Sequence, residues 1–153
     1  MQTGDTIHSD LTESVADAVL SASRGLVAVA ARSLSDVAEE VTLTQYRTLV
    51  VLASLGPHNL AGLAEAVGVT PATATRMCDR LVKKKLILRR AERDDRRQLR
   101  VALTKKGLAL VGTVTDRRRQ EIERITNEIP AEDQAMLVQV LRRFAAAAGE
   151  IPE

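Results

Sequence analysis

The chain has 153 residues, of which 45% are hydrophobic and 27% charged, with a single cysteine and no tryptophan. This length can bury one substantial core, so the fold needs neither disulfides nor metals. Segment 1–10 lacks the basic and apolar regions of a secretion signal, and no apolar run is expected to approach the ~20 residues that span a bilayer. We therefore expect a cytoplasmic protein with no membrane partner.

Basic side chains concentrate in one part of the chain. Residues 71–106 hold thirteen of the 22 Lys and Arg but four of the 20 Asp and Glu, a net charge of +9 against −7 for the remainder. Such polarity predicts a polyanionic partner. Tyr46 and Phe144 are the only aromatic residues, so the chain lacks a row of rings on which single-stranded bases could stack. Double-stranded DNA is favoured over RNA.

The first predicted element is a long amphipathic helix that begins at Ser14. Apolar residues recur from Val15 to Val37 in steps of three and four, which is the helical period. A helix of roughly 25 residues is about 37 Å long at ~1.5 Å per residue. The core of so small a domain cannot cover this length, and we expect part of the apolar face to contact another chain.

Two short helices are predicted next. Thr44 is expected to cap a helix over 45–55 that ends at Gly56-Pro57 and turns Leu49, Leu52 and Leu55 inward. Asn59 is expected to cap the second helix, which ends at Gly68 in the left-handed conformation that favours glycine.

Thr70 and Pro71 predict the start of a further helix, over 71–84, since threonine caps well and proline suits the first helical position. One face of this helix is apolar: Ala74, Met77, Cys78 and Leu81. The opposite face is polar and basic: Ala72, Thr73, Arg76, Arg80 and Lys83. A short helix, a tight turn and a basic-faced helix indicate a helix-turn-helix.

The apolar period then changes from helical to alternating, which predicts two strands, over 87–90 and 99–103. The eight residues between them are polar and charged, and Asp94 and Asp95 favour a turn, so they should form a wing. Thr104 is expected to cap a long helix to about residue 129. A last helix should begin at Pro130.

Three segments, 63–76, 79–84 and 95–107, carry a family resemblance. The third contains Asp95-Arg96-Arg97 and runs through Leu-Thr into a helix. Together they resemble the multiple antibiotic resistance regulator (MarR) family of winged-helix transcription factors, whose wing motif is Asp-x-Arg. With segment 43–46 upstream, the likeness extends from about residue 11 to 148.

The resemblance implies a mainly α (α+β) fold. A winged helix-turn-helix DNA-binding domain would cover 39–107, and a helical dimerisation region would combine 11–38 with 108–148. Similar proteins usually have glycine after the recognition helix, where this chain has Lys85. A left-handed lysine there would cost roughly 1 kcal/mol relative to glycine.

The outward face of helix 71–84 supplies the candidates for base contacts, and Arg76 is the best guanine reader because its guanidinium can bond two acceptors. The major-groove candidates are Thr73, Thr75, Arg76 and Arg80, and Thr70 and Ala72 are further candidates for DNA contact. Lys83, Lys84, Arg89 and Lys105 are expected to hold phosphate. Arg96 and Arg97 should enter the minor groove, and the resemblance implies that Asp95 braces Arg97.

Several alternatives compete with this hypothesis. The basic face could be merely solvated, or the winged helix could serve protein–protein contact, although that role needs no +9 segment. An enzyme would need a nucleophile with its base, a carboxylate pair or a phosphate loop, and none is legible. Cys78 could be a redox switch, but its inward position favours core packing. His8, expected in a loose tail, and His58 lack metal-ligand spacing, and we expect neither metal nor cofactor.

The resemblance also implies an effector pocket where the dimerisation helices meet the winged domain, often used by small aromatic or phenolic compounds. Here it would include Leu34, Tyr46, Arg47, Val50 and Val111. The expected function is that of a homodimeric repressor that binds a pseudopalindromic operator and is released by such a ligand. A constitutive DNA binder without ligand response is the alternative.

Overall fold

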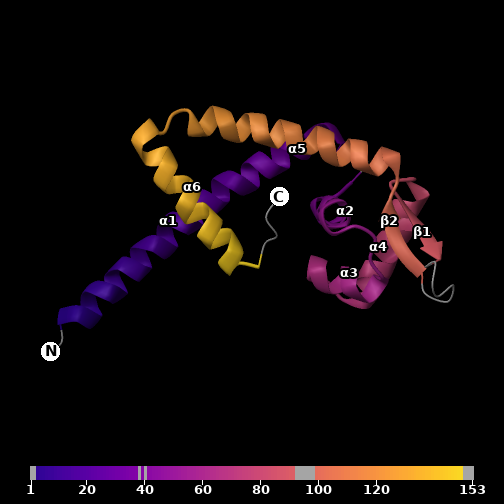
Figure 1. Ribbon diagram of the computed structural model, residues 1–153, viewed down its shortest axis with the longest axis horizontal. Helices are drawn as coiled ribbons and strands as arrows, with labels where there is room; N and C mark the ends of the chain where they lie inside the picture. Colours follow the sequence, from indigo (N-terminus) through magenta and orange to yellow (C-terminus); the bar gives the residue numbers. More distant parts are fainter. Residues whose placement is uncertain (1–2, 38, 40, 92–98, 150–153) are drawn as a thin grey trace.

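The computed structural model describes residues 3–37, 39, 41–91 and 99–149 and is mainly helical, with one two-stranded sheet (Figure 1). The elements in chain order are α1 (Thr3–Leu34), the 3-10 turn η1 (Ser35–Val37), α2 (Leu43–Leu55), α3 (Leu60–Val67), α4 (Pro71–Lys83), β1 (Ile87–Ala91), β2 (Leu99–Leu103), α5 (Lys105–Thr126) and α6 (Ala131–Ala147). This order confirms the predicted winged helix-turn-helix with long flanking helices.

Helix α1 is longer than predicted, because it begins at Thr3 and not at Ser14. The prediction relied on apolar spacing, which starts at Val15, whereas the preceding polar residues continue the helix without an apolar stripe. His8 therefore lies within a helix and not in a loose tail. The first half of α1 extends away from the winged part of the molecule (Figure 1).

The stretch Ser14–Val37 is long and apolar enough, by length and composition alone, to cross a membrane, and an 18-residue window within it has a mean hydropathy of 1.4. The sequence expectation of no such stretch was wrong, because it counted only uninterrupted apolar runs. Four charged residues, Asp17, Arg24, Arg32 and Asp36, interrupt this one, and an arginine near the middle of a bilayer costs about 2.5–3.5 kcal/mol on insertion scales. An apolar helix that packs against protein meets the same criterion.

The cap of α2 also differs from the prediction. Thr42, not Thr44, is the N-cap: its Oγ1 accepts from Gln45 N at 3.3 Å, and Gln45 Oε1 accepts from Thr42 N at 3.1 Å. This reciprocal pair is a capping box, and it satisfies two backbone donors that the helix leaves open. Leu55 was expected to face inward but is 38% exposed at the end of the helix.

The hydrophobic core lies among α2, α3, α4 and the sheet, where Leu49, Leu63, Leu81 and Leu86 are completely buried. Strands β1 and β2 pair antiparallel, with Ile87 opposite Leu103. His58 adds a bridge to Val101, which ties the loop before α3 to the sheet. Helix α5 leaves β2 and packs along α2 and α1.

Two backbone positions determine how the chain enters β1 and how α5 follows β2. Lys85 has φ of +60°, which confirms the left-handed conformation predicted for it. Gly107 allows α5 to approach the chain after α4: a Cβ built on it would lie 2.1 Å from the carbonyl oxygen of Leu86. No side chain fits there without movement of the backbone.

Candidate nucleic-acid interface and effector cavity

Helix α4 begins as the sequence predicts. Thr70 caps it, with Oγ1 accepting from Thr73 N at 3.2 Å and donating to Thr73 Oγ1 at 2.9 Å. Pro71 occupies the first turn, and Lys84 ends the helix in right-handed conformation. The cap fixes where α4 starts, and hence which side chains face outward.

The two faces of α4 separate as predicted. The inward residues are buried: Ala74, Met77, Cys78 and Leu81. Two of the described candidates for DNA contact, Thr73 and Lys84, are half-buried. The other described candidates are exposed: Thr70, Ala72, Thr75, Arg76, Arg80, Lys83, Arg89 and Lys105. Most of the proposed contact residues can therefore reach a ligand without rearrangement of the core.

Thr75 and Arg89 are among the candidates that already have intramolecular partners. Thr75 donates its hydroxyl hydrogen to the carbonyl oxygen of Pro71 at 2.9 Å, which leaves its oxygen as an acceptor. Arg89 Nη2 lies 2.5 Å from Asp79 Oδ1. This ion pair competes with phosphate for Arg89, so its contact with DNA would require exchange of one anionic partner for another.

Arg76 and Arg80 share a recess of about 310 Å³ with the start of α2. The recess is also lined by Thr42, Thr44 and Gln45. From the sequence, Thr44 was expected only as a helix cap and Thr42 was not singled out, so their position beside the recognition helix was missed. The signal was weak, because nothing in the spacing of α2 and α4 says that the two helix ends meet.

Asp95, Arg96 and Arg97, the predicted wing contacts, lie outside the residues that the structure describes. The strands that lead to and from them are present, since Ala91 pairs with Leu99. Their proposed contacts therefore remain predictions from the sequence.

Cys78 is fully buried in the core beside the inward face of α4. Burial raises the pKa of its thiol, and the nearby Arg89 guanidinium only partly opposes this effect. A raised pKa lowers the thiolate fraction, and the thiolate is the reactive form. The position supports core packing over a redox role.

A cavity of 660 Å³ lies where α1, α2 and α5 meet the turn before α4, within the size range of small-molecule sites. Tyr46, Arg47 and Val50, three of the predicted effector residues, line it. The other lining residues are Ala30, Leu43, Thr44, Val51, Val67, Gly68, Val69 and Arg118. We call this the Tyr46 cavity.

The remaining two predicted effector residues lie elsewhere. Leu34 is 6% exposed and belongs to the hydrophobic core. Val111 lines a separate recess of 520 Å³ between α2 and α5, which it shares with Val50 and Thr115. The predicted set is thus divided between a cavity, a recess and the core.

Helix α5 contributes two residues to the Tyr46 environment that the sequence did not single out. The hydroxyl groups of Tyr46 and Thr115 lie 3.1 Å apart, within hydrogen-bond distance. The Arg118 guanidinium carbon lies 5.5 Å from the centre of the Tyr46 ring, a cation–π distance. Arg118 Nε is buried and has no hydrogen-bond partner among the described residues.

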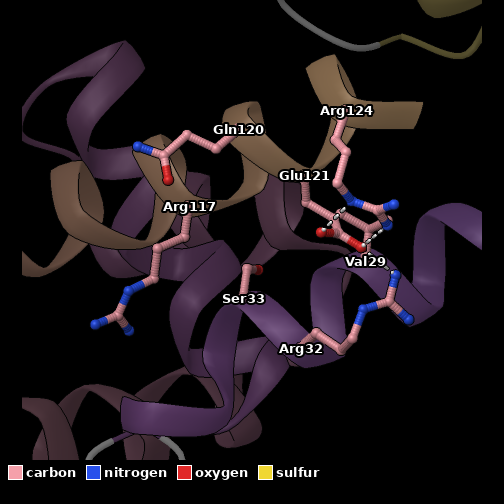
Figure 2. Close-up of a pocket in the computed structure, with 7 residues that line it drawn as sticks. All are labelled: Val29, Arg32, Ser33, Arg117, Gln120, Glu121 and Arg124. Atoms are coloured by element: carbon pink, nitrogen blue, oxygen red, sulfur yellow. Dashed lines mark hydrogen bonds and ion pairs between the residues drawn. The ribbon is translucent and has the colours of Figure 1, made fainter. Parts of the chain in front are cut away.

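Another cavity, of 340 Å³, lies between α1 and α5 and is lined by several arginines (Figure 2). There Glu121 Oε1 bonds Arg32 at 2.8 Å and Arg124 at 3.1 Å. These contacts lower the pKa of Glu121, with the Arg124 hydrogen bond the larger cause. Arg117 points to the opposite side (Figure 2) and pairs with Asp36 at 3.1 Å. This cavity, the Glu121 cavity, contains its own counterion.

Comparisons with known proteins agree with this architecture. A model of the MarR family matches residues 41–99. RV1404 from Mycobacterium tuberculosis has a crystal structure that superposes with a TM-score of 0.84, at 45% identity over 92% of this chain and 96% of that chain. The HTH-type transcriptional repressor NicR of Pseudomonas putida is 28% identical over 140 residues, which are 92% of this chain and 87% of NicR.

A more distant structure shows the same fold. It is that of BpsR from Bordetella bronchiseptica, with a TM-score of 0.64 at 24% identity, covering 86% of this chain and 92% of that chain. That structure concerns regulation of BpsR DNA binding by 6-hydroxynicotinic acid. MarR-family proteins bind DNA as dimers. With its winged helix-turn-helix, its exposed basic recognition helix and these relatives, the chain belongs to the MarR family of DNA-binding transcriptional regulators and is not an enzyme.

Proposed function

We propose that this protein is a cytoplasmic homodimeric repressor that binds a pseudopalindromic operator and releases it when a small aromatic or phenolic ligand binds. The observation that carries the DNA part is the outward face of α4, where Arg76, Arg80 and Lys83 are exposed. In a core-facing role these side chains would be costly, whereas in a major groove they meet base edges and phosphates.

Dimerisation is supported by apolar surface that the single chain leaves uncovered. Leu20 and Leu26 on α1 are 57% and 55% exposed, and Met136 and Phe144 on α6 are 68% and 51% exposed. A second copy would cover both helices by symmetry. Two recognition helices held about 34–36 Å apart would read both halves of a palindrome.

Within each half-site, Arg76 is proposed to read guanine, with Thr70, Ala72, Thr73, Thr75 and Arg80 around it. Lys83, Lys84, Arg89 and Lys105 would hold phosphates, and Arg96 and Arg97, braced by Asp95, would enter the minor groove. Thr42 and Thr44 join this proposed surface because they line the recess beside Arg76 and Arg80.

Ligand release is supported by the place of the Tyr46 cavity. Its lining runs from Ala30 on α1 to Gly68 and Val69, the turn directly before the Thr70 cap of α4. A ligand that binds better when this turn is displaced would bias the dimer away from its DNA-competent form by its differential affinity. Reversal from 1:99 to 99:1 requires about 5.5 kcal/mol of such difference, so a weak ligand should give partial release.

The deciding experiment is selection of bound fragments from the genomic DNA of the source organism with purified protein. A shared palindrome is expected, and titration of salicylate against the complex at fixed salt then tests release. If the operator is found but no aromatic acid changes its affinity, the protein is a constitutive DNA binder. If no sequence is enriched, the assigned role as an operator-binding repressor is wrong.

Two arginine variants separate the proposed contacts. Arg76→Ala should relax base preference at one position in each half-site, at a cost of about 1–3 kcal/mol there. Arg97→Ala should weaken binding to many sequences and flatten its salt dependence, since a groove-inserted arginine acts mainly through electrostatics. Wild-type affinity and specificity in both variants would place the DNA-binding face elsewhere.

A further inference from the structure

We propose that Asp79 is an affinity-limiting residue of the DNA-binding surface. Its ion pair with Arg89 keeps one phosphate-binding arginine occupied, so that the protein binds every duplex less tightly than its positive charge would allow. This inference rests on the proposed contact between Arg89 and phosphate and names the residue that opposes this contact. It predicts that removal of a charge from the recognition helix strengthens binding.

The first argument is the position of Asp79 on α4. Segment 71–106 contains thirteen basic and four acidic residues, and Asp79 is the only one of the four in the described part of this segment. It follows Arg76 by three residues and precedes Lys83 by four, so the three side chains are neighbours on the helix surface. The Asp79 side chain is 48% exposed. A phosphate that approaches this surface therefore meets one carboxylate among cations.

The second argument is the geometry of the ion pair. Asp79 Oδ1 on α4 lies 2.5 Å from Arg89 Nη2 on β1, which is close enough for a charge-assisted hydrogen bond. The Arg89 side chain is 35% exposed, so a ligand can reach it. A phosphate must either displace Asp79 or share the guanidinium with it. Displacement breaks the ion pair, and sharing brings two negative charges together, so both routes reduce the gain from the phosphate contact.

The third argument is that the fold does not depend on this ion pair. Strand β1 is held by its ladder to β2, which extends from Ile87 opposite Leu103 to Ala91 opposite Leu99. Ile87 is also 2% exposed in the core. Ion pairs between exposed side chains contribute little to stability. Loss of the Asp79 charge should therefore leave the fold intact and act on DNA binding.

The test compares the wild type with Asp79→Asn, which removes the charge and keeps the shape of the side chain. Fluorescence anisotropy measures binding to two duplexes of about 30 base pairs, long enough for two half-sites one helical turn apart. One duplex is the operator selected from genomic DNA, and the other has a random sequence. Asp116→Asn is the matched control, because it removes the same charge from an exposed position on α5, outside the proposed DNA-binding surface.

We expect Asp79→Asn to bind both duplexes more tightly. An exposed ion pair is equivalent to a factor of about 1.4 to five in an equilibrium constant, and a dimer contains the pair twice. The expected gain is therefore about two- to twenty-five-fold in about 0.1 M salt. Each freed arginine neutralises one more phosphate, so the slope of log affinity against log salt should steepen by about 0.9 per half-site. Asp116→Asn should leave affinity and slope nearly unchanged.

A double-mutant cycle tests whether Arg89 is the residue that Asp79 occupies. In the Arg89→Gln background, Asp79→Asn should lose most of its effect on affinity and all of its effect on the salt slope. Arg90→Gln provides the matched background, because Arg90 is the next residue of β1, is exposed and lies on the opposite face of the strand. There the gain from Asp79→Asn should persist. Denaturant unfolding should show that Asp79→Asn remains folded, with nearly unchanged stability.

Three results would overturn the inference. Weaker binding by Asp79→Asn would mean that Asp79 holds Arg89 in place for its phosphate contact. Unchanged affinity would mean that the ion pair has no effect on DNA binding. An equal gain with and without Arg89 would assign the effect to direct repulsion between Asp79 and DNA.

The wild type tests the proposed function separately. If it binds the operator and the random duplex equally at every salt concentration, the proposed operator-binding repressor is wrong. The change in affinity of Asp79→Asn for the random duplex still decides the inference in that case.

Discussion

The winged region and the helical arms share an amphipathic pattern of apolar side chains, but only the winged region buries them within the single chain. The winged region comprises residues 43–91 and 99–107, and the arms comprise residues 14–28 of α1 together with α6. Leu49 and Leu63 in the winged region are completely buried, whereas Val15 and Val27 on α1 are 61% and 62% exposed. Helix α6 has no buried residue at all among those described. The apolar side chains are therefore covered by the same chain in the winged region and left exposed in the arms.

This difference shows that an apolar stripe predicts burial without saying which molecule provides it. In the winged region, helices and strands follow one another closely, so that each stripe finds its partner within the chain. The arms lie at the two ends of the sequence, and both lie apart from the winged region (Figure 1). A second copy of the chain is required to cover their apolar faces. Experiments that change one region and spare the other test this difference.

The largest effect is expected for a charge placed in an arm. Leu141, on α6, is 50% exposed in the single chain, and Leu141→Asp should raise the dimer dissociation constant at least about a hundredfold. Burial of a leucine contributes about 1.5–3 kcal/mol, and a symmetric interface contains the substitution twice. Sedimentation velocity over a concentration series measures this change, and operator affinity should fall with it.

Gln139→Asp is the matched control, because it adds the same charge to α6 at an exposed polar position. It should leave association nearly unchanged. A wild-type protein that remains monomeric at micromolar concentration would contradict the role of the arms and, with it, the proposed palindromic operator.

The next largest effect concerns the winged region alone. Gly107→Ala should destabilise the protein by about 3 kcal/mol, which is the upper end of the usual cost of overpacking. The reason is that its Cβ would lie 2.1 Å from the Leu86 carbonyl oxygen. Denaturant unfolding at fixed protein concentration measures the change. Gly112→Ala, in the same helix, has nothing within 4 Å and should stabilise it by about 0.5–1 kcal/mol.

A third experiment tests the corrected start of α2. Thr42→Ala should cost about 1 kcal/mol of unfolding free energy, because the capping box loses a side-chain acceptor. Thr44→Ala, which the sequence alone would have singled out, should change stability by less than half as much. Equal effects would mean that the observed cap is not the one that stabilises the helix.

The sequence predicts the winged region well because its signals are local. Thr70-Pro71 marks a helix start, Gly68 a left-handed end, and the change of apolar period a strand, each readable within a few residues. The start of α1 was missed because polar residues can continue a helix without an apolar stripe. No signal within α5 distinguishes Arg118 from Arg117 and Arg119, since which one reaches Tyr46 depends on how α5 packs against α2.

The smallest expected effect lies at the exit from the recognition helix. Lys85 has φ of +60° and glycine adopts this conformation without a Cβ penalty, so Lys85→Gly should stabilise the winged region by about 0.5–1 kcal/mol. The gain is limited because glycine also gives the unfolded chain more freedom. Lys84→Gly removes the same charge one residue earlier, where φ is −80°. It should destabilise the winged region by a similar amount, because glycine gives the unfolded chain more freedom and relieves no strain at this position. Thermal unfolding of both variants gives the sign, and operator binding over a salt series gives the contribution of each charge. If both variants were destabilised equally, the left-handed conformation at Lys85 would carry no strain, and an additional contact of the lysine side chain would have to hold the chain there.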